Sequence, residues 1–267
     1  NRLGPLKPLF FSPFSHVMAQ TPRDKDRFGA LGIARDRILV AGNMKFDQGD
    51  LADDGTKENR LRSMLGIRGD DRVWIAGSTH EGEETIILEV FARLRKELGD
   101  LRLILAPRDP ERCKALSHGI QRHNTHGFVF WSDLEKGSCT GQSHGRELVL
   151  MDVMGVLAPS YAVCDLAFIG GSLVPLGGHN PLEPAMFGKP VLFGPHMTDF
   201  QGVADLLKKG KGAMEVAGAD ELEAGVKKLL EYPEFRDRMG RAGARIFRVN
   251  SGAVGRTVAI LEKICLG

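Results

Sequence analysis

Residues 168–185 read Phe168-Ile169-Gly170-Gly171-Ser172-Leu173-Val174-Pro175-Leu176-Gly177-Gly178-His179-Asn180-Pro181-Leu182-Glu183-Pro184-Ala185. An apolar run leads into this segment, and a helix is predicted to begin near Pro181 or Leu182. Two glycine pairs bracket the loop between strand and helix, and glycine lets backbone amides approach a ligand without an obstructing Cβ. A helix start adds unpaired N–H groups and the positive end of its dipole. The segment therefore predicts a strand, an anion-binding loop and a helix.

Around this segment, short apolar runs alternate with helical patterns, which is typical of βαβ units and a parallel sheet covered by helices. One amphipathic stripe predicts a crossover helix over about residues 83–96, and two more predict helices near the C-terminus, the last a long one. Six strands are predicted, at Arg72–Ala76, Leu101–Ala106, Phe128–Trp131, Leu148–Met151, Leu166–Ile169 and Pro190–Phe193.

The first 45 residues form a separate pattern, in which predicted strands His16–Gln20 and Ile38–Ala41 flank a charged helix, Pro22–Leu31. This pattern resembles the tail of another α/β unit. The polar stretch Asp47–Glu58 is predicted to be a linker, and Ser132–Gly145 a mobile loop. We therefore expect two domains, residues 1–45 and residues 46–267.

Composition excludes several classes of protein. The 36 basic and 34 acidic residues are interspersed, so the chain lacks the charged footprint of a nucleic-acid-binding protein. No apolar run approaches the ~20 residues that span a bilayer. The four cysteines form no C-x-x-C pair, which suits a reducing compartment and argues against structural zinc. With no Walker loop, no G-x-G-x-x-G after the first strand and no metal-spaced cluster, no cofactor or metal is predicted.

Two other segments follow predicted strands at the edge where parallel sheets bind ligands. Ser78 or Thr79 could cap the next helix or bind an anion, and a plain capping box is the somewhat better interpretation of that segment alone. Arg108 could reach a phosphate or carboxylate, or equally form a surface ion pair with Asp109 or Glu111.

Two side chains of the glycine segment have alternative roles. Glu183 could be an ordinary carboxylate of a first helical turn, or could accept both hydroxyls of a ribose. His179 alone would more often be a packed side chain, but beside Asn180 and two glycines the ligand-facing interpretation is favoured. Together these residues suggest a site for a nucleotide leaving group, as in sugar-nucleotide chemistry.

The segments Gly170–Ala185, Gly77–Glu84, Pro107–Arg112, Gly42–Asp47 and Met151–Leu157 resemble the 3-deoxy-D-manno-octulosonic acid (Kdo) transferase family of lipopolysaccharide assembly. The resemblance covers essentially the whole chain. It implies a GT-B fold: a Rossmann-like donor domain with a parallel sheet covered by helices, plus a fragment of a second, acceptor-side Rossmann-like domain. The implied reaction is inverting, metal-independent transfer of Kdo from CMP-Kdo to the lipid A precursor, on the cytoplasmic face of the inner membrane.

The resemblance also implies roles for single residues. Glu183 would accept the cytidine ribose hydroxyls, Lys45 would face the donor from the interdomain segment, and Met154 and Gly155 would lie against the base. The phosphate and the Kdo carboxylate would be surrounded by Ser78, Thr79, Arg108, Gly171, Ser172, His179 and Asn180. His80, Gly177 and Gly178 complete the expected donor-binding set.

This chain departs from the family pattern at Asp109, Val153 and Val156, where the family usually has His, Thr and Glu. The last two changes remove polar groups that could contact base or ribose. The family's general base and membrane-contacting segment belong to an early region that we expect to be absent here, so no catalytic base is predicted. A UDP-sugar glycosyltransferase, a UDP-sugar epimerase and a non-catalytic nucleotide-binding module are the alternatives.

Overall fold

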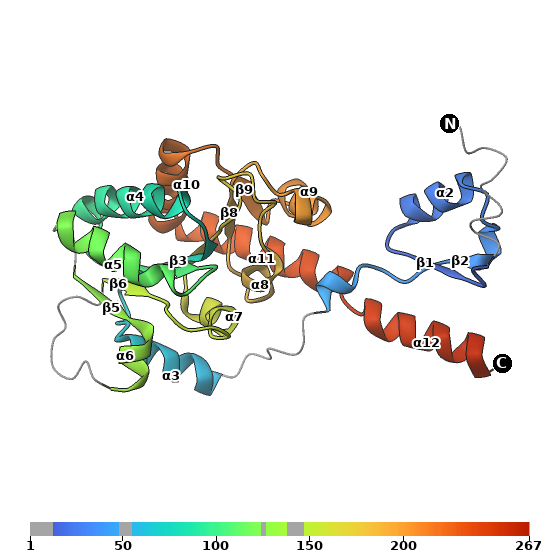
Figure 1. The fold of residues 1–267 in the computed structure, drawn as a ribbon, viewed down its shortest axis with the longest axis horizontal. Coiled ribbons are helices and arrows are strands. Elements are labelled where there is room, and N and C mark those ends of the chain that lie inside the picture. The colour runs from blue at the N-terminus through green and yellow to red at the C-terminus, as the bar shows by residue number, and fades with distance from the viewer. Residues whose placement is uncertain (1–12, 48–54, 124–126, 138–146, 267) are drawn as a thin grey trace. The chain divides into compact units, whose positions relative to one another are not determined.

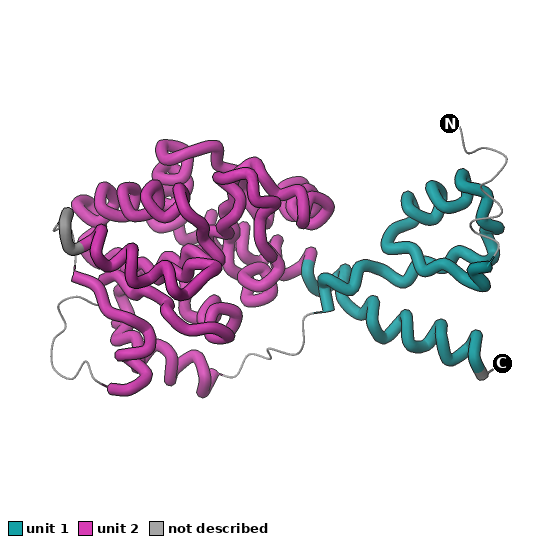
Figure 2. The backbone as a smooth tube through the Cα atoms, viewed as in Figure 1, with its two compact units in different colours: residues 1–50, 247–267 teal, residues 51–246 magenta. Residues whose placement is uncertain are grey.

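The computed structural model describes residues 13–47, 55–123, 127–137 and 147–266. The chain divides into two compact units, residues 1–50 with 247–267 and residues 51–246 (Figure 2). The expected domains follow chain order, whereas here the last residues group with the first fifty. No described helix is long and apolar enough to cross a membrane.

The larger unit, residues 51–246, is built on a seven-stranded sheet (Figure 1). All neighbouring strands pair in parallel, in the order β5-β6-β4-β3-β7-β8-β9. The strands are β3 (Arg72–Thr79), β4 (Leu101–Pro107), β5 (Phe128–Phe130), β6 (Leu148–Leu150), β7 (Leu166–Ile169), β8 (Val191–Phe193) and β9 (Ala213–Glu215). The six predicted strands are confirmed, and β9 is an additional edge strand.

The central strands are buried on both faces, which is expected when crossover helices cover both sides of a parallel sheet. One face packs on α4 (Glu83–Glu97) and α10 (Ala219–Glu231), whose side chains Ile87, Phe91, Leu222 and Val226 share one core with the sheet. The remaining helices of this unit are α3 (Gly55–Leu65), α5 (Arg112–His123), α6 (Trp131–Glu135), α7 (Leu157–Ser160), α8 (Leu182–Met186), α9 (Gln201–Lys209) and α11 (Pro233–Asn250), whose last four residues are assigned to the smaller unit.

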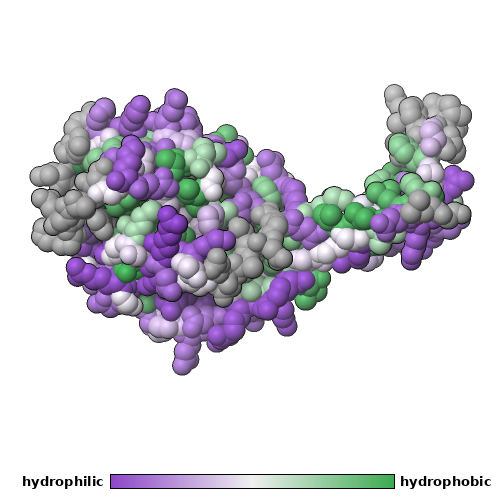
Figure 3. Space-filling model, turned by 90° about the horizontal axis from the view of Figure 1, so that it is seen from below, coloured by the Kyte–Doolittle hydropathy of each residue, from purple (hydrophilic) through white to green (hydrophobic). Residues whose placement is uncertain are grey.

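Two predicted boundaries change. Helix α6 occupies the start of the expected mobile loop, and residues 138–146 lie outside the described residues. Helix α3 begins inside the expected linker, of which residues 48–54 are likewise not described. On the face shown in Figure 3, hydrophilic residues cover most of this unit and apolar residues form small patches between them.

The smaller unit contains the parallel pair β1 (Val17–Ala19) and β2 (Ile38–Val40), joined by α2 (Pro22–Ala30). Thr21 caps α2 by accepting the N–H of Asp24 at 3.1 Å. The long terminal helix α12 (Ala253–Leu266) belongs to this unit, and Arg256 Nε donates to the carbonyl of Ala41 at 2.8 Å. The predicted strand–helix–strand pattern of the first 45 residues is confirmed.

Candidate functional site

A pocket of about 200 Å³ lies at the carboxyl ends of β3, β4 and β6. This is the edge at which ligands bind in open parallel sheets. Five predicted residues line it, namely Ser78, Arg108, Met154, Gly155 and Glu183. The other lining residues are Ala106, Pro107, Met151, Val153, Leu157 and Ala158, which the sequence analysis did not assign to the site.

Glu183 and Arg108 give this pocket its charge. Burial raises the pKa of the half-buried Glu183 carboxyl, while the Asn180 amide and the positive charge of Arg108 act in the opposite direction. Asn180 Nδ2 donates to Glu183 Oε1 at 3.3 Å. The Arg108 side chain is exposed and forms no ion pair within the described part of the chain, so the predicted pair with Asp109 or Glu111 does not occur. An opposite charge on a ligand can therefore meet Arg108 in this pocket.

A histidine pair lies beside Arg108. His80 and His179 stack with ring planes 7° apart, and their Nε2 atoms are 2.7 Å apart. One of the two nitrogens must carry the shared proton while the other accepts it, which disfavours a second charge. Burial lowers the pKa of His179, and the nearby His80 and Arg108 lower it further, whereas Asp199 raises it. His179 therefore acts as a neutral hydrogen-bonding group near neutral pH.

The turn that contains the first glycine pair, which we call the glycine turn, binds the carboxylate of a side chain of the protein itself. Glu83 is fully buried, and its carboxylate accepts the backbone N–H groups of Gly171 at 2.7 Å, Ser172 at 2.9 Å and Leu173 at 2.8 Å. It also accepts the N–H of His80 at 3.0 Å. The amides of Gly171 and Ser172 thus already donate to a side chain of the protein, and their predicted contact with a ligand phosphate stays a prediction. Glu83 is the first residue of α4, with Gly82 as its N-cap, so the local sequence shows only a helix-start acid and gives no signal for this role.

Several other predicted side chains are structural. The Thr79 hydroxyl is fully buried, with no hydrogen-bond partner among the described residues, so it cannot contact a ligand in the pocket. Ser172 Oγ donates to the carbonyl of Ile169 and accepts the N–H of Gly194 at 2.8 Å. These side chains thus have structural roles, and the predicted phosphate contacts of Thr79 and Ser172 stay predictions.

The second glycine pair is closed by packing. Gly177 and Gly178 have φ of 86° and 73°, a left-handed conformation that favours glycine. A Cβ at Gly177 would lie 2.7 Å from the Asp199 carboxyl carbon, and one at Gly178 would lie 2.3 Å from Met197 Sδ. The Gly178 N–H also donates to the carbonyl of Gly171 at 2.9 Å. These glycines allow close packing rather than an open anion site.

Asn180 and Lys45 also lie outside the pocket lining. Asn180 lies just before helix α8: its Oδ1 accepts the N–H of Leu182 at 3.1 Å, and its Nδ2 donates to Glu183. Lys45 belongs to the smaller unit, and its predicted role toward the donor stays a prediction. Among the described residues, no cluster of His, Cys, Asp and Glu could hold a metal ion.

Comparisons with known proteins show which chains and folds this protein is similar to. Residues 1–48 match a family model described as 3-deoxy-D-manno-octulosonic-acid transferase (kdotransferase). A 3-deoxy-D-manno-octulosonic acid transferase of Haemophilus influenzae is 34% identical over 98% of this chain and 60% of its own length. The crystal structure of the C-terminal CMP-Kdo binding domain of WaaA from Acinetobacter baumannii is 27% identical, with a TM-score of 0.63, over 72% of this chain and 96% of that one.

A more distant structure shares the fold alone. Anabaena Alr3699/HepE in complex with UDP-glucose is 17% identical, with a TM-score of 0.55, over 94% of this chain and 63% of that one. The parallel sheet, its ligand edge and these neighbours define a fold of the GT-B glycosyltransferase class. Within that class, the chain belongs to the Kdo transferase family. It spans about 60% of the length of the Haemophilus influenzae relative.

Proposed function

We propose that the chain binds CMP-Kdo in the pocket at the carboxyl ends of β3, β4 and β6. The observation that supports this proposal most directly is that Arg108 and Glu183 line the same pocket. A sugar nucleotide presents negative charge, which suits Arg108, and ribose hydroxyls, which suit Glu183. The similarity to the CMP-Kdo binding domain of WaaA supports the same donor. In this proposal Glu183 accepts the ribose hydroxyls, with its carboxylate oriented by the amide of Asn180.

Arg108 then matches the charge of the donor, which carries a phosphate and a Kdo carboxylate. Guanidinium binds either group through two parallel hydrogen bonds. The neutral His179 adds a hydrogen bond rather than a second cation, since burial and Arg108 lower its pKa. Met154 and Gly155 line the side of the pocket where the base would lie.

The proposed reaction is the transfer of Kdo to the lipid A precursor at the cytoplasmic face of the bacterial inner membrane, with inversion and without a metal ion. An acceptor hydroxyl attacks the anomeric carbon, the bond from that carbon to the phosphate oxygen breaks, and CMP leaves as an anion that Arg108 stabilises. A general base must take the proton of the acceptor hydroxyl. We assign no residue of this chain to that step, and we expect the isolated chain to bind the donor with slow turnover or none.

Calorimetric titration with CMP tests the donor site. We expect saturable binding that weakens about tenfold or more in Arg108→Gln and in Glu183→Gln. The exposed neighbour Asp109→Asn serves as the matched control and should leave the affinity unchanged. Unchanged CMP binding in both Arg108→Gln and Glu183→Gln would contradict the proposed site.

A parallel titration with UDP separates the donors. Tighter binding of UDP than of CMP would favour a UDP-sugar glycosyltransferase or epimerase of the same fold. Tight CMP binding without transfer to a lipid A acceptor, in a chain joined to a relative's acceptor-side domain, would favour a non-catalytic nucleotide-binding module.

A further inference from the structure

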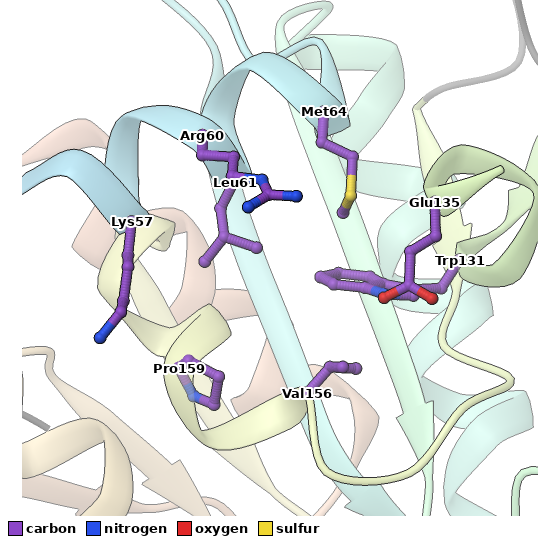
Figure 4. A pocket seen from close by; sticks show the side chains of 8 residues that line it. All are labelled: Lys57, Arg60, Leu61, Met64, Trp131, Glu135, Val156 and Pro159. Atoms are coloured by element: carbon purple, nitrogen blue, oxygen red, sulfur yellow. The ribbon is translucent and has the colours of Figure 1, made fainter. Parts of the chain in front are cut away.

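A second cavity, of about 400 Å³, lies between α3, α6 and α7 (Figure 4). All of its lining residues belong to the larger unit, and none of them lines the pocket of Arg108 and Glu183. The lining residues are Lys57, Arg60, Leu61, Met64, Trp131, Glu135, Val156 and Pro159. Nothing in the proposed donor chemistry uses this cavity.

The wall of the cavity is apolar. Leu61 and Met64 reach in from α3, and Trp131 faces them from α6 (Figure 4). Val156 and Pro159 close the opposite side. Trp131 Nε1 donates to Glu135 Oε1 at 3.0 Å, so the indole has its polar atom bonded and offers only hydrocarbon. Such a wall binds an alkyl chain by removing it from water, and it has few groups that could bind a sugar.

The rim of the cavity is cationic on the α3 side. Lys57 and Arg60 are exposed and lie three residues apart, on the same helical face as Leu61 and Met64. In Figure 4 all four side chains extend from one side of α3. Glu135, on the opposite side, accepts the Trp131 indole N–H and keeps its negative charge, so it directs an anionic head toward the α3 side. Helix α3 therefore presents apolar contact and positive charge together.

We propose that this cavity binds an anionic amphiphile with a single alkyl chain. The chain lies between Leu61, Met64 and Trp131, and the phosphate or carboxylate head meets Lys57 and Arg60. The volume falls within the range of small-molecule sites, roughly 300–1,000 Å³. The proposal is independent of the donor site, because the two pockets have no lining residue in common.

Tryptophan fluorescence of the full chain provides the assay. The protein has two tryptophans, both buried, and only Trp131 lines the cavity, so a ligand there is sensed by Trp131. The probe is dodecyl phosphate carrying bromine on its chain, used below its micelle concentration, since bromine quenches an indole that it touches. We expect saturable quenching by this probe, much weaker binding of the uncharged dodecyl maltoside, and no competition by inorganic phosphate alone.

Variants connect the quenching to the named residues. Arg60→Glu should lower the affinity for the probe about tenfold, because it replaces an attraction with a repulsion near the head group. Arg241→Glu, an exposed residue of α11, makes the same charge change and should have no effect. Leu61→Phe and Met64→Phe fill the cavity and should each weaken the probe, with calorimetry as the readout and an unchanged unfolding midpoint as the check on folding.

The outcomes separate this proposal from the donor site. Absence of saturable quenching would overturn it, as would equal binding of the charged and uncharged amphiphiles with no effect of Arg60→Glu. Saturating CMP should leave the affinity for the probe unchanged. Competition by CMP would show that the probe occupies the donor pocket instead, and would also overturn the proposal.

Discussion

The buried carboxylate of Glu83 allows a sharp test of how the glycine turn is held. Its Oε1 accepts the N–H groups of Ser172 and Leu173, and its Oε2 accepts those of Gly171 and His80. Glu83→Gln keeps nearly the same shape but replaces one oxygen with an NH₂ group. That group is a donor, and it would face two backbone donors with no acceptor between them.

The cost follows from counting the N–H groups that lose their partner. Each buried and unsatisfied group costs about 1–3 kcal/mol, so two of them lower the free energy of unfolding by roughly 2–6 kcal/mol. This is a large share of the roughly 5–15 kcal/mol by which typical domains are stable. Glu83→Ala leaves all four N–H groups unpaired, and we expect little folded protein from that variant.

Urea unfolding followed by tryptophan fluorescence measures this loss in the correct unit, because Trp74 and Trp131 both lie within residues 51–246. Glu81→Gln is the matched control. Its side chain is 87% exposed, 3.3 Å from Arg112, and such exposed pairs contribute at most about 1 kcal/mol. A Glu83→Gln variant as stable as the control would refute the reasoning that this carboxylate holds the turn.

Three further predictions concern the same region. Gly170→Ala should lower the free energy of unfolding by about 1–3 kcal/mol, since the new Cβ would lie 2.3 Å from the carbonyl oxygen of Ser78. Gly202→Ala is the control, because no atom lies within 4 Å of its added Cβ, and it should leave the urea midpoint unchanged or higher. Burial lowers the pKa of His179 below 6.5, so the unfolded chain takes up this proton at a higher pH than the folded chain does. The free energy of unfolding should therefore fall as the pH drops below 6.5. In His179→Asn this fall should be smaller, and urea midpoints at several pH values measure the difference. Burial raises the pKa of Glu183 above 4.5, so the charged carboxylate destabilises the folded chain once the pH rises past that value. Glu183→Gln should therefore unfold at a higher urea concentration near neutral pH, although it binds CMP more weakly.

The order of the strands along the chain was predictable, whereas some elements were not. Strand β9 has three residues, of which only Ala213 is buried, so it carries no apolar run. Helix α11 contains Gly240 and Gly243, which weaken the helical pattern because glycine costs about 1 kcal/mol in a helix. Gly240 is needed there since a Cβ would lie 1.8 Å from the carbonyl oxygen of Gly188. The glycines of α11 are thus explained by its close packing against a distant segment, which the local sequence pattern does not show.

The candidate site divides in the same way. Ser78 and Arg108 could be placed at the pocket because they lie at the ends of neighbouring strands, and the carboxyl ends of parallel strands share one edge. Glu183 could be placed there because it lies in the first turn of the helix that follows the glycine loop after β7. The role of Glu83 could not be predicted from local pattern alone, because three of its four bonds join it to residues 88–90 positions further along the chain. Before folding brings these segments together, Glu83 reads only as a helix-start acid.

The occupied glycine turn changes which group must recognise a negatively charged donor. A nest of backbone amides and an arginine can both bind phosphate, and the sequence offers both. In the folded chain Glu83 neutralises the amides of Gly171 and Ser172, so a second anion there would face a buried carboxylate. Arg108 is exposed at the pocket and has no ion-pair partner among the described residues, so it is the group whose charge a ligand can complete. The glycine turn acts on the site indirectly, through the positions it gives to His80 and His179.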